Sequence, residues 1–156
     1  MAKSIRQLIL ENIETTLAGV TTAAGYNTTF KAAQINRSAI GLGRENVWPT
    51  ILIGVSDLPS TVSTSMSGDE VARELTVDLI LGLGGNVSVM PTEVEEAVAD
   101  IIKAMAVDTT RGGNACVTND PEIREPTYSQ VIDGHAFVTL SYVINYVHKR
   151  TDATLP

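Results

Sequence analysis

The sequence predicts one α/β domain of the α+β kind, in which two helices pack on one face of a mostly antiparallel or mixed β-sheet, in the order α-β-β-β-α-β-β. Three observations carry this prediction. Two segments place apolar residues at helical spacing, and two others alternate apolar and polar residues as strands do. A chain of 156 residues with 44% hydrophobic residues also has the size and composition of one globular domain. We assign residues 1–150 to this domain and residues 151–156 to a polar C-terminal tail.

The first helix is expected over residues 4–18. Ser4 and Gln7 form a capping-box pattern at its start, and Gly19 stands where a helix ends. The apolar residues that recur at helical spacing are Ile5, Leu8, Ile9, Ile13 and Leu17.

Three strands are expected before the second helix. Residues 27–36 have a weak strand pattern, and residues 50–56 form a run of β-formers typical of a buried strand. Residues 71–81 alternate clearly between apolar and polar side chains. The connections are a long loop at 37–49 and a Ser- and Thr-rich segment at 57–70, which is either a mobile loop or an exposed hairpin arm.

The second helix is expected within residues 90–108, after a flexible connection at 82–90. Thr92 and Glu95 form a second capping-box pattern, and acidic residues crowd the start of the helix, where its dipole is positive. One predicted face is apolar, with Val94, Ala97, Val98, Ile101, Ala104 and Met105; the opposite face carries Glu96, Asp100 and Lys103.

The C-terminal part holds a strand near 114–124 and a long strand at 135–149. The long strand has apolar residues on both faces, which is typical of a central strand. Two helices cover only one face of a sheet, so we expect another subunit to cover the face that carries Val143 and Val147. This interpretation predicts a homo-oligomer.

The charge balance argues against a protein that holds nucleic acid by phosphate contacts. The chain has 11 Lys and Arg against 18 Asp and Glu, for a net charge of -7. The single cysteine, Cys116, excludes an intramolecular disulfide and fits a reducing compartment. The N-terminus lacks a signal-peptide pattern, and no stretch has the ~20 apolar residues of a membrane span. We therefore expect a soluble protein of the cytoplasm without membrane contact.

The segment DTTRGGNACVT, residues 108–118, resembles a phosphate-binding loop at first sight. A phosphate loop lies between a strand and a following helix, whereas these glycines follow a helix and precede a strand. Gly112 and Gly113 stand where a helix C-cap belongs, and Arg111 is placed to meet the free carbonyls of the last turn. The pattern therefore favours a structural junction.

No pattern in the sequence predicts a catalytic, metal or cofactor site. A GxSxG nucleophile pattern is absent, and Cys116 falls in a predicted strand as a small core residue. His135 and His148 lie at opposite ends of one predicted strand, too far apart to share an ion. We interpret Glu93, Glu95 and Glu96 as charges that favour the helix start. The sequence thus favours a protein that is not an enzyme.

A family resemblance rests on the helix that ends in D-x-T-R-G-G-x-A, from Asp108 onward, and on the last strand with Tyr142 and Tyr146. With a WP-initiated strand and a hairpin arm before them, these features resemble the tail terminator, or tail completion, proteins of long-tailed bacteriophages, over about residues 5–150. The segments 57–70 and 82–90 do not align with the family pattern.

The resemblance implies a hexameric ring that caps the head-proximal end of the tail tube, ends its polymerisation and joins the neck of the virion. The implied partners are further copies of the chain, the tail tube protein and a neck or head-completion protein, with DNA passing through the ring without specific binding. The virion is then the final location, after assembly in the host cytoplasm. An acidic chain agrees with such a conduit.

Candidate interface residues lie on the irregular segments and on the open sheet face. The first group is Arg37, Arg44 and Trp48, where Trp48 either contacts a partner or packs in its own core. The second group is Ser63 and Met66 in the arm at 60–68, which either adds an edge strand to a neighbour or is disordered. Val143 and Val147 complete the set.

Two alternative functions remain at this point. One is another neck component, such as a head-closure, head-tail joining or minor tail protein. The other is a small cytoplasmic enzyme or ligand-binding domain that uses Cys116 and His135.

Overall fold

The structure is a computed structural model that describes residues 3–37, 48–55, 62–64, 69–85, 90–124 and 135–149. Its helices are α1 (Ile5–Ala18) and α2 (Met90–Val107), with short 3₁₀ turns η1 (Thr22–Ala24) and η2 (Ala32–Gln34). Its strands are β1 (Ile35–Asn36), β2 (Thr50–Val55), β3 (Val62–Thr64), β4 (Glu70–Gly84), β5 (Val117–Thr118), β6 (Glu122–Arg124) and β7 (His135–Lys149). The predicted α+β class is confirmed.

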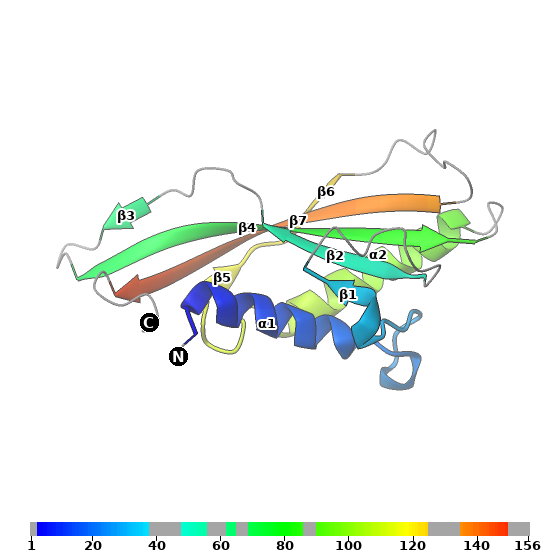
Figure 1. Cartoon of the computed structure of the whole chain (residues 1–156), viewed down its shortest axis with the longest axis horizontal. Helices are drawn as coiled ribbons and strands as arrows, with labels where there is room; N and C mark the ends of the chain where they lie inside the picture. The colour runs from blue at the N-terminus through cyan, green and yellow to red at the C-terminus, as the bar shows by residue number, and fades with distance from the viewer. Residues whose placement is uncertain are drawn as a thin grey trace.

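One mixed sheet runs through the whole molecule (Figure 1). Its centre is an antiparallel ladder in which β4 and β7 pair along their full 15 residues, from Glu70 opposite Lys149 to Gly84 opposite His135. The strand order is β1-β2-β4-β7-β5, with β3 added to β4 and β6 added to β7. Only β1 and β2 pair in parallel.

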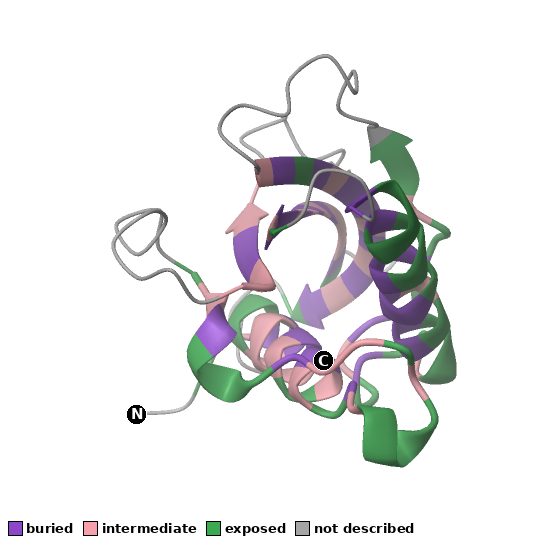
Figure 2. Cartoon of the chain, turned by 90° about the vertical axis from the view of Figure 1, so that its right-hand side faces the viewer, coloured by how far each residue is buried: buried purple, intermediate pink, exposed green. Residues whose placement is uncertain are grey.

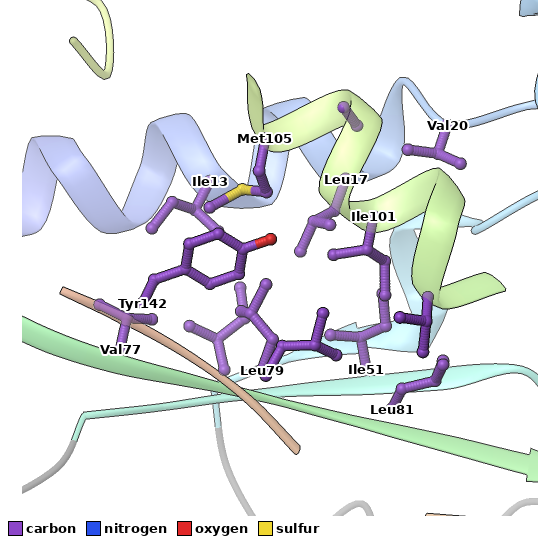
Figure 3. Close-up of a cluster of buried hydrophobic side chains, with 14 of the residues drawn as sticks. Ile13, Leu17, Val20, Ile51, Val77, Leu79, Leu81, Ile101, Met105 and Tyr142 are labelled. Carbon is purple, nitrogen blue, oxygen red and sulfur yellow. The ribbon is translucent and has the colours of Figure 1, made fainter. Parts of the chain in front are cut away.

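Both helices pack on the same face of this sheet. Alternating residues of β4 and β7 turn toward the helices and are buried, as the alternation in the sequence predicted. Figure 3 shows the centre of this core, with Ile13, Leu17, Ile101 and Met105 of the helices facing Ile51, Val77, Leu79, Leu81 and Tyr142 of the strands. We call the opposite face the helix-free face. Viewed along the strands, the sheet curls, and both helices lie outside the curve (Figure 2).

The prediction of a strand at 27–36 is wrong, except for the two residues of β1. The Thr21 side chain accepts a hydrogen bond from the Ala24 amide and starts η1. The buried carboxylate of Asp100 accepts hydrogen bonds from the Thr28 amide (2.7 Å) and from the Asn27 side chain (3.3 Å). Side chains therefore hold this backbone where a strand ladder would otherwise form. The same contacts correct the placement of Asp100, which is buried rather than solvent-facing.

The prediction of a second capping box, at Thr92 and Glu95, is also wrong. Helix α2 begins at Met90, so Thr92 and Glu95 lie inside the helix and are exposed on its surface. Strand β4 continues to Gly84, so residues 82–84 belong to the sheet rather than to a flexible connection. At the first helix the Ser4 side chain does accept the hydrogen bond of the Gln7 amide, as predicted, while the Gln7 side chain turns to Glu11.

Two short strands replace the single strand predicted near 114–124. Strand β5 pairs with β7 at Asn145 and Ile144, and β6 pairs with it from Ser141 to Thr139. Pro121 lies between them and has no amide hydrogen to donate to a ladder, so pairing is interrupted there. Within 57–70, β3 pairs antiparallel with β4, which favours the hairpin-arm alternative over the mobile loop.

Candidate interaction surfaces

The junction after α2 is a structural joint built around a buried arginine. Arg111 is fully buried, and it donates hydrogen bonds from Nη2 to the carbonyl oxygen of Met105 and from Nε to the hydroxyl of Thr118 (3.0 Å). Arg111, Gly112 and Gly113 all adopt left-handed backbone conformations, with φ of 52°, 69° and 82°. The predicted contact of Arg111 with a carbonyl of the last helical turn is confirmed. Gly112 and Gly113, in contrast, lie in the turn that follows the helix and not at its C-cap, because α2 already ends at Val107. With its side chain enclosed, Arg111 has no surface left for a phosphate group.

Asp108 ties this joint to α1. Its carboxylate accepts hydrogen bonds from the amide and hydroxyl of Thr110, from the Gly112 amide (2.6 Å) and from the Asn12 side chain on α1 (3.1 Å). Partial desolvation raises the pKa of Asp108, but these hydrogen bonds together outweigh it, so its pKa lies below the ordinary value. The carboxylate therefore adds stability that is present above pH 4 and is lost as the pH falls through its folded-state pKa.

Tyr142 provides a pH test of the same buried region. Its side chain is 2% exposed, and its hydroxyl has no hydrogen-bond partner among the described residues. Burial raises the pKa of Tyr142 well above the ordinary value near 10, against a smaller opposing effect of the Arg111 charge. The neutral phenol is thus favoured in the folded state, and this stability is complete below pH 10 and declines as the pH rises further.

We expect Tyr142→Phe to lose this alkaline sensitivity. Above pH 10 the free energy of unfolding of the wild type should fall more steeply than that of the variant, by up to about 1.4 kcal/mol per pH unit. Urea unfolding of both proteins at pH 7, 9 and 11 measures the difference. Parallel pH dependence of the two proteins would contradict the assignment.

Trp48 lies on the helix-free face, at the end of the sheet where β4 finishes. Its ring packs against Gly82 and Gly84: a Cβ atom on Gly84 would lie 2.5 Å from the Trp48 Nε1 atom. On β7 its ring lies 4.7 Å from the ring of His135 and 6.1 Å from that of Phe137, measured between centroids. Trp48 is half-buried, so it packs on its own sheet and still presents part of its ring to the surface.

The two predicted arginines do not form a site with Trp48 in the described residues. Arg37 donates from Nε and Nη2 to the carboxylate of Glu14 on α1, at 2.5 and 2.8 Å. The ion pair joins two partly exposed side chains, so it contributes little to stability. Arg44 lies outside the described residues.

The other end of the sheet extends as an arm, formed by β3, the first part of β4 and the last part of β7 (Figure 1). Val143 and Val147 lie on its helix-free face, opposite Thr76 and Ala72, and both are half-buried. Val117 of β5 is opposite Asn145, between the two valines, and is 40% exposed. These three valines, Val117, Val143 and Val147, form what we call the arm patch. The predicted orientation of Val143 and Val147 is therefore confirmed.

The predictions for Ser63, Met66 and Cys116 have different outcomes. Ser63 lies in β3 opposite Ala72, and Met66 lies outside the described residues. Cys116 is exposed, which corrects its prediction as a core residue. Its amide donates to the carbonyl of Asn145, before β5 begins, so it stands at the sheet margin beside a cavity of about 170 Å³.

The residues of the enzyme alternative are not brought together. Cys116 lies beside Asn145, ten residues along β7 from His135, a separation of about 33 Å at the rise of a strand. His148 lies near the far end of β7 and accepts a hydrogen bond from Nε of Arg73 (2.9 Å). The described residues contain no group of three His, Cys, Asp or Glu side chains that could hold a metal ion. Within the same residues, no helix is both long and apolar enough to cross a membrane.

Comparison with known proteins adds no further assignment. The sequence matches no model of a known protein family and no curated protein.

Proposed function

We propose that this chain is the structural subunit of a ring, most simply of six copies, that caps the head-proximal end of a phage tail tube. The ring ends polymerisation of the tube and provides the surface that joins it to the neck or head-completion protein. DNA passes through its centre without specific binding.

The observation that carries this proposal is the helix-free face of the sheet. The β4–β7 ladder extends beyond the part that the helices cover (Figure 1). The arm patch places three valines on the helix-free face, from Val143, which lies behind the helix-covered core, toward Val147 on the arm. Apolar side chains on a projecting strand pair favour contact with another protein surface, because burial of apolar area stabilises association.

The positions of the surfaces favour a ring over an isologous pair. The arm lies at one end of the molecule and the Trp48 end of the sheet lies at the other (Figure 1). When one end of a subunit contacts a different surface of the next, the contact is heterologous and repeats until the ring closes. The family resemblance at Asp108–Gly113 and in the last strand supplies the number six and the place in the tail. The net charge of -7 agrees with a passage that does not retain DNA.

Light scattering after size-exclusion chromatography tests the ring. Six copies of the 16.6 kDa chain give a mass of about 100 kDa. Val143→Asp/Val147→Asp places two carboxylates in the arm patch, and we expect this variant to elute as a monomer because buried, unpaired charge opposes association. A monomeric wild type at low micromolar concentration would refute the ring.

Val107→Asp is the matched control. It makes the same chemical change at a side chain that is 79% exposed at the end of α2, away from the sheet, so the assembly should persist. If Val107→Asp dissociates the ring as well, the effect of the arm variant is not specific.

An amber mutation in the gene tests the place of the ring in the virion. Overlong or unattached tails in electron micrographs are expected for a terminator. Normal tails beside heads that leak DNA would instead assign the chain to head closure.

A further inference from the structure

We propose that the cavity between the start of α2 and Trp48 binds an arginine side chain presented by a partner protein. The cavity lies at the end of the sheet where β4 finishes, so that it is lined both by Leu83 on the helix side and by Gly84 beneath Trp48. Its volume is about 390 Å³, and its lining also includes Thr28, Thr29, Glu93 and Glu96. Its volume lies at the lower end of the range of small-ligand pockets, about 300–1,000 Å³, and is sufficient for one large side chain. The inference concerns a different surface from the arm patch and does not depend on ring formation.

One wall is an aromatic ring held in place. Because residues 82 and 84 are glycines, the Trp48 indole lies directly on the β4 backbone, with His135 and Phe137 packed beside it. Atoms on several sides therefore limit the movement of the ring. A fixed indole offers a flat surface on which a guanidinium group stacks favourably.

A second wall carries two carboxylates. Glu93 and Glu96 are three residues apart on α2, so they lie on the same side of the helix, and both are exposed. The ion pairs of the described residues join Lys3 to Glu11 and Arg37 to Glu14 and leave these two glutamates without a cation. Lys103, the basic residue of α2, donates to the Gly25 carbonyl and lies over the Tyr26 ring.

The third wall is a polar segment fixed to the same helix. Asp100, one turn after Glu96, accepts a hydrogen bond from the Thr28 amide, and Thr29 accepts one from the Thr22 amide. The cavity wall at 28–29 is thus anchored before any ligand arrives. Walls that are already ordered in the free protein bind a ligand without a further loss of their own conformational entropy.

This combination selects a flat cation. Two carboxylates repel an anion and attract a positively charged group. A guanidinium group has hydrogen-bond donors for both carboxylates, and its flat face can stack on the indole. Glu93 and Glu96 are exposed at the mouth of the cavity, so a side chain that projects from the surface of another protein can reach both carboxylates. The chemistry therefore points to a protein partner with an exposed arginine.

The fluorescence of Trp48, the only tryptophan of the chain, reports occupation of the cavity directly. The probe is the peptide acetyl-Gly-Arg-Gly-amide, and the matched probe is the same peptide with citrulline, which has the shape of arginine without its charge. We expect a saturable change in emission with a dissociation constant in the millimolar range, weakened by salt, for the arginine peptide only. The titration uses the wild-type chain and Val143→Asp/Val147→Asp, so that contact between copies at the arm is removed in one sample.

The variant Glu93→Gln/Glu96→Gln keeps the shape of both side chains and removes their charge, and it should weaken binding at least about 5-fold. Glu95→Gln is the control, because it removes one charge from the same turns of α2 at a residue outside the cavity lining, and it should leave the affinity within about 2-fold. Circular dichroism checks that each variant is folded.

The proposal is overturned if neither the wild type nor the arm variant responds, if citrulline gives the same response as arginine, or if the double glutamine variant binds as tightly as the wild type. The mass of each sample from light scattering separates this result from the fate of the ring. A monomeric wild type that binds the peptide supports the cavity site and refutes the ring. A wild-type ring, with no response to the peptide in either the ring or the arm variant, supports the ring and refutes the cavity site.

Discussion

Replacing Arg111 by alanine is expected to lower the free energy of unfolding by about 3 kcal/mol. The side chain is fully buried at the end of α2, so its removal leaves a cavity. It also leaves the Met105 carbonyl and the Thr118 hydroxyl without the donors that Arg111 supplies. Urea unfolding monitored by circular dichroism measures the loss.

Two further variants separate the causes. Arg111→Met removes the buried charge just as alanine does, but it refills much of the cavity, so it should be less destabilising than alanine. Arg37→Ala removes an exposed arginine and should change stability by less than about 1 kcal/mol. A loss below 1 kcal/mol for Arg111→Ala would show that the joint after α2 does not depend on this side chain.

Gly84→Ala is expected to displace Trp48 and to destabilise the protein by about 2 kcal/mol. A Cβ atom at this position would lie 2.5 Å from Nε1 of Trp48 and 2.7 Å from Nδ1 of His135, and both distances are far below van der Waals contact. At least one ring has to move away from the sheet. The emission of Trp48 should then shift to longer wavelength, because the indole becomes more exposed to water.

Gly54→Ala is the control for this variant. Gly54 lies in the neighbouring strand β2, and a Cβ atom there meets only the Asp78 carbonyl oxygen at 3.7 Å and the Asp78 Cβ atom at 4.0 Å, which are ordinary contacts. Its stability and emission should stay close to those of the wild type. If Gly84→Ala also keeps the native emission, Trp48 does not rest on Gly84 in solution.

The sequence predicted the elements whose signals are local. Strands β4 and β7 follow from the alternation along residues 71–81 and 135–149, and α1 follows from its apolar spacing and the Ser4 cap. Residues 27–36 were predicted wrongly because their partner, Asp100, lies far away in the chain and its contact has no local pattern. Pro91 is the signal that could have placed the start of α2, because proline favours the first turn of a helix and Thr92 then lies inside it.

The interaction surfaces were predictable to the extent that strand alternation fixes a face. Val143 and Val147 face away from the helices for this reason. The position of Trp48 depends on glycines at 82 and 84, and glycines inside a strand are a recognisable signal of close approach that the expected flexible connection at 82–90 concealed. Glu93 and Glu96 were interpreted only as helix-start charges, since the cavity beside them exists only once residues 28–29 and Trp48 are in place.

The long β4–β7 ladder has a consequence for the order of folding. Gly84 and His135 are its closest paired residues in the sequence, and Glu70 and Lys149 are its most distant, so closing the ladder at the Gly84 end loses the least chain entropy. We expect pairing to begin there, next to α2, and to advance residue by residue toward the arm. The arm is then the last part of the sheet to form and the first to open, and amide hydrogen exchange should quicken steadily along β7 from the middle of the strand to Lys149. We therefore expect the surface that carries the arm patch to be completed only after the core has folded. In the proposed ring, this order would delay contact between copies until each chain is folded.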